Sequence, residues 1–524
     1  MRRAWLLVAC LPGGLAACAG ESKPDPLCDV DACAAEGKLC DGDACVDPWR
    51  HGSPAFSRCE QEPRATAESL AEKARVYDER AIGLHTHPLM PWVVDVVLEP
   101  GTNPETATHV DVAAWWSGEN DGLFSGLVLA AEAYRLAVTK SPEARAAVAT
   151  LLRGERMRME ITGVPGLFTR QLIPPGVDGL ACPTETSMYT PSPDKRGNKW
   201  VRIGDDGCAQ VVDEGTTTFR STTHCGLQRY AGWCFLDNIS QDEYVGHVFA
   251  LGAIARVVDD AELRGEALAM LQQIGEHLRA HDMVFVDWDG RQTQWGKLYP
   301  GAPGDTPGYL AILGMSFAAT AAVDPSLEAA YRALAWDGYF GEIDQWSGAD
   351  GCGANWNNLA MLTASFHHLV WNEHDPARRA VIQGAFEREL ARPPTTTRGI
   401  LDQHNAWWQI LWAAQKPLGP GTDGPAYAAV EDAVCQLRQF PRSNHTVARD
   451  TAALAPGVCL DRQDNSLAQD AFEIADRCAG TFAYWGNPYE RSTCDAWHEL
   501  VHQPGGYLLP YWMGRFYGFI GADQ

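Results

Sequence analysis

The distribution of hydrophobic and polar positions repeats along most of the chain. From about residue 64, an apolar segment is followed by a tight turn and then by a segment with one apolar face. The segments before the turns, 123–137, 245–258 and 310–323, are apolar or small on nearly every side, which is typical of helices packed on both faces. After the first turn, apolar residues recur at helical spacing from Ala144 to Leu152, so this helix buries one face only. The pattern therefore predicts inner helices that alternate with outer ones.

The turns between these helices carry residues that favour helix starts. Ser141, Asp324 and Asp375 each offer a side-chain acceptor at the N-cap, and each precedes a proline at the first helical position. Asp260 begins a similar turn without the proline. We predict that these four positions start outer helices.

Two further helix pairs are expected nearer the C-terminus, 406–412 with 427–437 and 467–477 with 508–520. About six inner and six outer helices would close into one toroid over residues 64–524, and closure explains how so long a chain can form a single domain. The prediction is an all-α fold with β-hairpins and loops at its rim. One hairpin is expected at residues 287–296, with Asp-Gly at its turn.

The N-terminus differs from this pattern. Arg2 and Arg3 precede an apolar run and small residues, as in a cleaved export signal over residues 1–17. The segment Leu15-Ala16-Ala17-Cys18 resembles the signal box of bacterial lipoproteins, in which the cysteine is lipidated and becomes the mature N-terminus. We therefore expect an exported protein that is lipid-anchored through Cys18 at the bacterial cell envelope (outer membrane or cell surface) and contacts the membrane through this lipid only. The alternative is an ordinary cleaved signal peptide in which the cysteine occurs by chance.

The remaining cysteines support export. Of 16 cysteines, Cys10 and Cys18 belong to the signal region, and the other 14 form an even number that suits disulfides in an oxidising compartment. Residues 18–63 contain few large apolar side chains, so crosslinks would have to replace a core there. The first four cysteines of this segment are separated by four, six and four residues, which does not match zinc knuckles: Cys28, Cys33, Cys40 and Cys45. We predict a small Cys-rich linker.

Composition and charge indicate a folded globular protein and argue against nucleic acid as a partner. With 46% hydrophobic and 21% charged residues, the chain has the balance of a folded globular protein. Its 42 Lys and Arg against 67 Asp and Glu give a net charge of −25, which repels nucleic acids and anionic lipid headgroups. After the N-terminus, no unbroken run of about 18 apolar residues is present to span a bilayer. Nucleic acid is therefore not expected as a partner.

Polar residues gather at the starts of the predicted inner helices. In a ring, these starts open on one rim and become neighbours in space although they are distant in sequence. Capping explains a single Asp at a helix start, but several polar residues at every start exceed that need. The residues are Glu119, Asn120 and Asp121; Asp242, Glu243 and His247; Asn355, Asn357 and Asn358; and His404 with Asn405.

Three sequence motifs, two of which lie at these helix starts, are the basis of a family resemblance. They are Trp116-Ser117-Gly118-Glu119-Asn120-Asp121-Gly122, Ser240-Gln241-Asp242-Glu243-Tyr244-Val245-Gly246-His247 and Tyr511-Trp512-Met513-Gly514-Arg515. Together with the repeated helix pairs, they resemble the (α/α)6 toroids of many glycoside hydrolases, polysaccharide lyases and sugar epimerases, and uncharacterised secreted bacterial lipoproteins of that type. The resemblance covers roughly residues 64–524. It implies an (α/α)6 toroid and an enzyme that acts on a poly- or oligosaccharide, with hydrolysis of a glycosidic bond as the first hypothesis.

Hydrolysis of a glycosidic bond needs two carboxyl groups, one a general acid with a raised pKa and the other a base or nucleophile. We predict Asp121 and Glu243 as this pair. Asp242 would cap its helix or hold His247, and Glu119 is the substitute if Asp121 is structural.

A lyase or epimerase on the same fold is the alternative. Such an enzyme would use His247 or Tyr244 as the base that takes a proton from a uronate carbon. Asn357, His404 and Arg515 would then neutralise the substrate carboxylate.

The 19 tryptophans fit a sugar-binding cleft, because indole faces stack on pyranose rings. Most of them are expected in the core. Those beside polar motif residues complete the predicted substrate-binding set: Trp116, Asn120, Tyr244, Trp295, Asn357, His404, Asn405, Trp408, Trp512 and Arg515.

One motif favours a different class of protein. Residues His498 to His502 form a literal H-E-x-x-H, which on a helix places two imidazoles on one face to bind zinc beside a glutamate. Leu508 stands where a third histidine ligand belongs, and Pro504 would end the helix, so we expect a helix end at the surface instead. No cofactor is expected; zinc at His498 and His502, and calcium at the 287–290 turn, are the alternatives. A zinc metallopeptidase and a non-catalytic glycan-binding lipoprotein thus stay open beside the enzyme hypothesis.

Overall fold

The computed structural model describes residues 39–41, 44–46, 68–300, 307–336, 338–345, 355–391, 399, 403–415, 425–452, 456–461, 465–478 and 486–522. The chain divides into two compact units, Met1–Asp47 and Pro48–Gln524. In the first unit, strands β1 (Leu39–Asp41) and β2 (Ala44–Val46) pair antiparallel, with Cys40 opposite Cys45. The predicted export signal, Cys18 and most of the predicted 18–63 linker lie outside the described residues.

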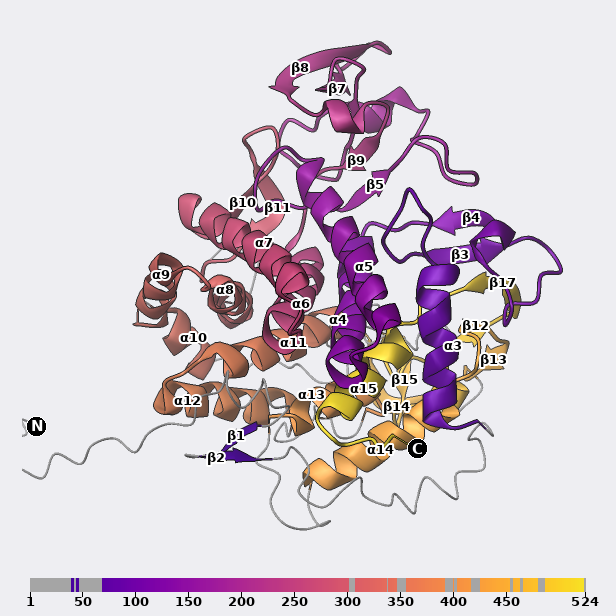
Figure 1. The fold of residues 1–524 in the computed structure, drawn as a ribbon, viewed down its shortest axis with the longest axis vertical. Coiled ribbons are helices and arrows are strands. Elements are labelled where there is room, and N and C mark those ends of the chain that lie inside the picture. Colours follow the sequence, from indigo (N-terminus) through magenta and orange to yellow (C-terminus); the bar gives the residue numbers. More distant parts are fainter. Residues whose placement is uncertain are drawn as a thin grey trace, which may run out of the picture. The chain divides into compact units, whose positions relative to one another are not determined.

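The second unit is mainly helical (Figure 1). Its α-helices are α3 (Leu70–Gly83), α4 (Asp121–Thr139), α5 (Pro142–Glu160), α6 (Gln241–Val257), α7 (Ala261–Ala280), α8 (Pro307–Ala321), α9 (Pro325–Trp336), α10 (Tyr339–Gln345), α11 (Trp356–Asn372), α12 (Pro376–Phe386), α13 (Ala406–Ala413), α14 (Pro425–Gln439) and α15 (Gly505–Phe516).

Six of these helices contact one another in a closed cycle. Helix α4 packs on α6, α6 on α8, α8 on α11, α11 on α13, α13 on α15, and α15 returns to α4. Each has an outer partner: α5 for α4, α7 for α6, α9 and α10 for α8, α12 for α11, α14 for α13, and α3 for α15. Helix α3 is the first described helix of this unit and α15 the last, and they lie beside each other in Figure 1. The two ends of the unit therefore complete the cycle.

The predicted helices and their starts are largely confirmed. Segments 123–137, 245–258 and 310–323 correspond to α4, α6 and α8, and 406–412 with 427–437 correspond to α13 and α14. At the predicted caps, Ser141 accepts the N–H of Ala144 at 3.1 Å, and Asp260 accepts the N–H of Leu263 at 3.0 Å. Asp375 caps α12 in the same way. The capping side chains thus set where the outer helices begin.

Helices α4 and α6 approach each other through glycine. A Cβ on Gly126 would lie 2.5 Å from the carbonyl carbon and oxygen of Gly246, and a Cβ on Gly246 would lie 2.4 Å from Leu123 Cα. Any larger residue would push the two backbones apart.

By length and composition, helix α4 could cross a membrane, but 72% of its apolar 18-residue window is buried inside the protein.

The expectation of an all-α fold is incomplete, because the described residues also form sheets. A five-stranded antiparallel sheet has the order β5-β9-β6-β7-β8, and a four-stranded one has the order β12-β17-β3-β4. The strands of the larger sheet are β5 (Gln171–Ile173), β6 (Trp200–Ile203), β7 (Cys208–Val212), β8 (Phe219–Cys225) and β9 (Cys234–Leu236). Those of the smaller sheet are β3 (Asp95–Leu98), β4 (Val112–Trp116), β12 (His445–Thr446) and β17 (Trp497–Val501).

Both sheets pack on one hydrophobic core, which includes Val96, Trp115, Ile203 and Phe235. Disulfide Cys182–Cys234 joins the loop between β5 and β6 to β9, and Cys208–Cys225 joins β7 to β8. Cys478–Cys494 joins strand β16 (Thr493–Cys494) to a residue 16 positions earlier in the chain. The predicted hairpin at 287–296 is confirmed, as β10 (Val284–Val286) pairs with β11 (Gln292–Lys297).

One predicted helix pair is wrong. Residues 467–477 form strand β15 (Ser466–Ala468), which pairs with β14 (Pro456–Leu460), and a short 3-10 turn, Ile474–Asp476. Helix α15, expected at 508–520 and found at Gly505–Phe516, instead has α3 as its outer partner. The apolar pattern of residues 467–477 is compatible with a helix as well as with a strand. Pairing with β14 made its first residues a strand.

Candidate active site at the starts of α4 and α6

Asp121 is the first residue of α4, and its side chain is almost completely buried. Its Oδ1 accepts the backbone N–H of Gly118 at 2.7 Å, and its Oδ2 is bonded to the hydroxyl of Ser117. Burial raises the pKa of Asp121 to about 7, although the charge of Arg158 and these two hydrogen bonds oppose the rise. At neutral pH this carboxyl therefore holds a proton in a large fraction of molecules.

Glu243 lies in the first turn of α6 and is wholly buried. Its Oε2 accepts the N–H of Leu123 at 3.0 Å, so a carboxyl from α6 caps the start of α4. Burial raises the pKa of Glu243 well above its usual value, against the charges of Arg170 and Arg158. The structure thus brings the predicted pair, Asp121 and Glu243, to the junction of the same two helices.

His247 follows Glu243 by one turn and is also wholly buried. Its Nδ1 is bonded to Glu155 on α5, and its Nε2 lies 3.9 Å from Glu243 Oε2. Its ring stacks on Phe168 with 3.9 Å between the ring centroids and an 8° angle between the planes. A Cβ on Gly122 would lie 2.3 Å from Glu243 Oε2, so only glycine lets α4 pass this close.

Sequence reasoning missed Glu155 and Arg158, both of which are fully buried. The Arg158 guanidinium donates to the carbonyl of Arg170 at 3.0 Å and lies over the Trp92 ring. A signal was present: both charged residues continue the buried stripe of α5 that Leu151 and Leu152 belong to. Charged residues on a buried face need partners, and here these are His247 of α6 for Glu155 and the carbonyl of Arg170 for Arg158.

Two carboxylates at the same helix starts have surface that faces solvent. Glu119 is exposed, and its Oε2 accepts from Asn198 Nδ2 at 2.7 Å. Asp242 is partly exposed and is bonded to the hydroxyl of Ser240. Arg170 fixes the approach to α4 by donating to the Glu119 carbonyl and to Asn120 Oδ1, both at 3.3 Å.

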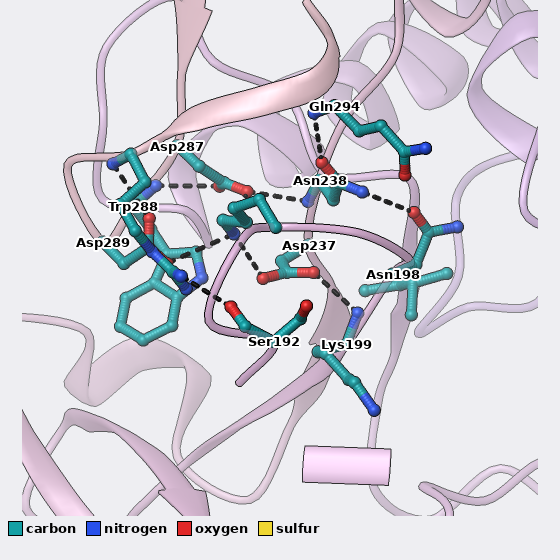
Figure 2. Close-up of polar contacts among 12 residues, drawn as sticks. Ser192, Asn198, Lys199, Asp237, Asn238, Asp287, Trp288, Asp289 and Gln294 are labelled. Carbon is teal, nitrogen blue, oxygen red and sulfur yellow. Dashed lines mark hydrogen bonds and ion pairs between the residues drawn. The ribbon is translucent and has the colours of Figure 1, made fainter. Parts of the chain in front are cut away.

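Exposed indoles lie close by. Trp116 ends strand β4, immediately before the Asp121 turn, and is 50% exposed. It meets the 40% exposed Trp497 of β17 edge to face, with 5.4 Å between the ring centroids. Trp295 on β11 is 47% exposed, and the N–H of its neighbour Gln294 donates to Asn238 Oδ1 at 2.7 Å (Figure 2). Apolar rings and carboxylates thus share one rim.

A second polar group lies at the starts of α11 and α13. Asn355 and Asn405 act as N-caps, accepting from Asn358 at 3.4 Å and from Trp408 at 3.3 Å. His404 Nδ1 lies 2.9 Å from a carboxylate oxygen of Asp432. Asn357 is partly exposed, whereas Trp408 is buried and stacks on Trp356 with centroids 6.0 Å apart.

Three residues of the predicted substrate-binding set lie inside the helix packing. The Tyr244 hydroxyl is bonded to the carbonyl of Gly166, and burial raises its pKa. Trp512 donates to Asp78 at 3.0 Å, and Arg515 donates to the Tyr511 hydroxyl at 3.1 Å. The polar groups of Tyr244 and Trp512 are therefore occupied by intramolecular contacts, whereas Arg515 is partly exposed.

The H-E-x-x-H motif lies on strand β17 and not on a helix. Consecutive residues of a strand point to opposite faces, so His498 and Glu499 diverge, and the predicted helix end here is wrong. His502 follows the strand and is bonded through Nδ1 to Asp95 at 2.7 Å. Among the described residues, no group of three or more His, Cys, Asp or Glu side chains is arranged to hold a metal ion.

No protein-family model matches the chain, and no curated protein matches it in sequence. Solved structures similar to it include a family 76 glycoside hydrolase from a bovine Bacteroides thetaiotaomicron strain, at 9% identity and a TM-score of 0.38, covering 85% of this chain and 77% of that one. Endoglucanase CelQ from Clostridium thermocellum, complexed with cellotriose, gives 12% identity, a TM-score of 0.39 and coverage of 86% and 70%. The cellulase Cel9M of C. cellulolyticum gives 12%, 0.36, and 90% and 100%. These neighbours are glycoside hydrolases.

Proposed function

We propose that the protein hydrolyses glycosidic bonds of a poly- or oligosaccharide, and that its closed cycle of helix pairs is an (α/α)6 toroid. The observation that carries the proposal is the Asp121 carboxyl: burial raises its pKa to about 7, and the exposed residues Trp116 and Glu119 precede it in the same turn. A general acid must be protonated at the working pH, and burial is the usual way in which a protein achieves this.

In the proposed reaction, Asp121 gives its proton to the leaving oxygen as the bond between that oxygen and the anomeric carbon breaks. A second carboxylate takes a proton from water, whose oxygen forms the new bond to the anomeric carbon. Glu119 and Asp242 face solvent and are candidates for this base. Glu243, our predicted partner, is enclosed and holds the N–H of Leu123, which suits a positioning role for the start of α4.

The lyase alternative is less well supported by the geometry. Its proton-abstracting base would be His247 or Tyr244, and both are completely buried with their bonds directed inward. A base that takes a proton from a sugar carbon has to contact that sugar. Glu119 and Asp242 have solvent-facing surface and Asp121 keeps 6% exposure, whereas His247 and Tyr244 are 0% exposed.

Substitutions of the three carboxyls test the proposal. Asp121→Asn, Glu119→Gln and Asp242→Asn would be assayed on a panel of glycans by reducing ends and product mass. Asp121→Asn and one of the other two should lose about 10²–10⁴-fold in turnover. Glu143→Gln, at an exposed site in the first turn of α5, is the matched control and should keep full activity.

Two outcomes would contradict hydrolysis. Glycan binding without turnover by the unmodified protein would indicate the non-catalytic glycan-binding lipoprotein instead. Unsaturated products that absorb in the ultraviolet would indicate elimination and return the chemistry to His247 and Tyr244.

We also propose that the protein is exported and lipid-anchored through Cys18. The disulfides of the described residues support an oxidising compartment. Mass spectrometry of the mature N-terminus tests the anchor, since a chain that begins elsewhere than at a diacylated Cys18 would contradict it.

A further inference from the structure

Arg80 of α3 carries a buried charge that no described side chain neutralises. Its side chain is 6% exposed, and none of its three guanidinium nitrogens has a hydrogen-bond partner among the described residues. The carboxylate that acts on its charge is that of Glu105, which is about half exposed and lies 4.0 Å from Arg442 instead. Burial lowers the pKa of Arg80, as expected of a cation that has lost its water without gaining a counter-ion.

The place of Arg80 in its helix does not account for this burial. Arg80 lies in the last turn of α3, where the helix dipole favours a cation, but that field supplies no acceptor for the five N–H groups of a guanidinium. An ionised group is costly to bury unless it is paired and hydrogen-bonded. Two other buried cations of the chain follow this rule, since Lys73 donates to three carbonyls and Lys195 pairs with three carboxylates.

The surroundings of Arg80 follow from the register of α3 on the chain after α14. Lys73 donates to carbonyls between positions 437 and 440, and the Tyr77 hydroxyl donates to the Pro441 carbonyl at 2.6 Å. Arg80 is the next residue on this face, because residues three or four positions apart are neighbours on a helix. It therefore lies at segment 443–445, and its charge accordingly acts on His445.

Segment 443–445 contributes further unpartnered polar atoms. Ser443 Oγ, Asn444 Oδ1 and His445 Nδ1 are buried and have no hydrogen-bond partner in the described part of the chain. The backbone here is fixed, because the His502 N–H donates to the Asn444 carbonyl at 2.8 Å and Asn444 Nδ2 donates to the Gln503 carbonyl at 3.2 Å. A hydroxyl and an imidazole nitrogen can both donate, whereas an amide oxygen accepts. Unused donors thus come from α3 and from the segment beside it.

We propose that Arg80, Ser443 and His445 bind a small oxyanion between α3 and the start of β12. The planar guanidinium presents paired N–H groups that match two oxygens of a carboxylate, a sulfate or a phosphate. A ligand that reaches so enclosed a charge has to be small. This proposal does not rest on the proposed hydrolase function.

Calorimetry on the unmodified protein, dialysed into an amine buffer free of oxyanions, tests binding directly. Sodium acetate, sulfate and phosphate are the probes, with sodium chloride keeping the ionic strength constant. One of them should bind 1:1 and raise the melting temperature by about 3 °C at roughly 100 times its Kd. The strongest response to acetate would identify a carboxylate as the ligand, and the strongest response to sulfate or phosphate an inorganic oxyanion. Absence of binding by all three probes would overturn the proposal.

Arg80→Met keeps the apolar stem and removes the charge. In the oxyanion-free buffer this variant should melt about 2 °C above the unmodified protein, because an unpaired buried cation is gone. It should bind no probe, and any rise of its melting temperature in sulfate then measures the general exclusion of this salt from protein surfaces. A variant that melts below the unmodified protein by the same amount with and without oxyanion would show that Arg80 is paired within the chain, which would overturn the proposal.

Arg75→Met is the matched control, because Arg75 lies on the same helix but is exposed and pairs with Glu72 and Glu79. It should keep the probe affinity of the unmodified protein. Ser443→Ala provides a second test that holds even if Arg80→Met does not fold, and it should weaken the affinity about tenfold. Binding of a probe with unchanged affinity by Ser443→Ala and Arg80→Met would locate the anion elsewhere and overturn the site.

Discussion

Asp121 shows how one buried carboxyl sets both stability and chemistry. Its pKa is raised to about 7 mainly by burial, so the folded protein binds more protons than the unfolded chain between about pH 4 and 7. For such a group, stability is present below the unfolded pKa and is lost as pH rises through the folded pKa. Three pKa units set an upper bound of about 4 kcal/mol on this contribution.

Asp121→Asn should therefore remove part of this pH dependence. Asn is always neutral and can keep both contacts, accepting from Gly118 and donating to Ser117. We expect the variant to gain about 1–3 kcal/mol relative to the unmodified protein between pH 4.5 and pH 8, measured by urea unfolding. A stability difference that is constant over this range would show that the Asp121 carboxyl titrates normally.

The exposed tryptophans lead to a separate prediction about affinity. Trp116 and Trp497 expose indole surface next to the Asp121 turn, and stacked sugar rings would cover it. Trp116→Ala and Trp497→Ala should each weaken glycan affinity by about tenfold, which corresponds to about 1.4 kcal/mol. Calorimetry or inhibition on a bound oligosaccharide measures the change. Val110→Ala, which alters another exposed apolar residue, should leave glycan affinity unchanged. Equal losses of affinity in all three variants would show that Trp116 and Trp497 do not stack on the sugar rings.

At the scale of elements, the contact between α4 and α6 depends on glycines that have no room for a side chain. A Cβ on Gly126 would meet backbone atoms of Gly246 at 2.5 Å, so one helix would have to move. We expect Gly126→Ala to destabilise the protein by about 3 kcal/mol or more, measured by urea unfolding. Gly265→Ala on α7 is the control, because nothing lies within 4 Å of its added Cβ, and it should stabilise by up to about 1 kcal/mol. A neutral Gly126→Ala would mean that the helices are less tightly packed than described.

The sequence predicted such elements where their signal was local. Cap residues such as Ser141 and Asp375 and the apolar length of 123–137 are local, and the helices form where these signals indicate. The strands of the five-stranded sheet are three to seven residues long and are stabilised by neighbours and disulfides from elsewhere in the chain, which no local pattern shows. The helix end predicted at residues 498–502 is wrong for the same reason: the pairing of β17 with β3, which is distant in sequence, sets the conformation of this segment.

The candidate site could be predicted only in part. Asp121, Glu243 and Glu119 stand at helix starts, and a ring of helices brings such starts together. The contact between Glu155 and His247 could not be found in this way, since the two residues are 92 positions apart and meet only through tertiary structure. The buried stripe of α5 indicates that Glu155 is buried, but it does not indicate which residue Glu155 contacts.

At the scale of the whole helical unit, closure depends on its two ends. Lys73 of α3 is fully buried and donates to three carbonyls at the C-terminal end of α14, those of Leu437, Arg438 and Phe440, at 2.6 to 3.1 Å. Tyr507 of α15 donates to the Leu70 carbonyl at 2.7 Å. One lysine thus connects the first outer helix to the end of another outer helix, beside the last inner helix.

Lys73→Met should open this closure. The carbonyls of Leu437, Arg438 and Phe440 would lose the lysine donor, although that of Leu437 also accepts the N–H of Phe440. A lost buried hydrogen-bond partner costs about 1–3 kcal/mol, so we expect a loss of about 2 kcal/mol or more in urea unfolding. Lys140→Met is the control, because Lys140 forms an exposed ion pair with Asp259 and should change stability by less than about 1 kcal/mol. Amide hydrogen exchange tests whether α3 closes the cycle of helices. If it does, the Lys73→Met variant should show faster exchange in both α14 and α15, while α7 stays protected. Faster exchange confined to α3 would show instead that the remaining helices hold the ring without it.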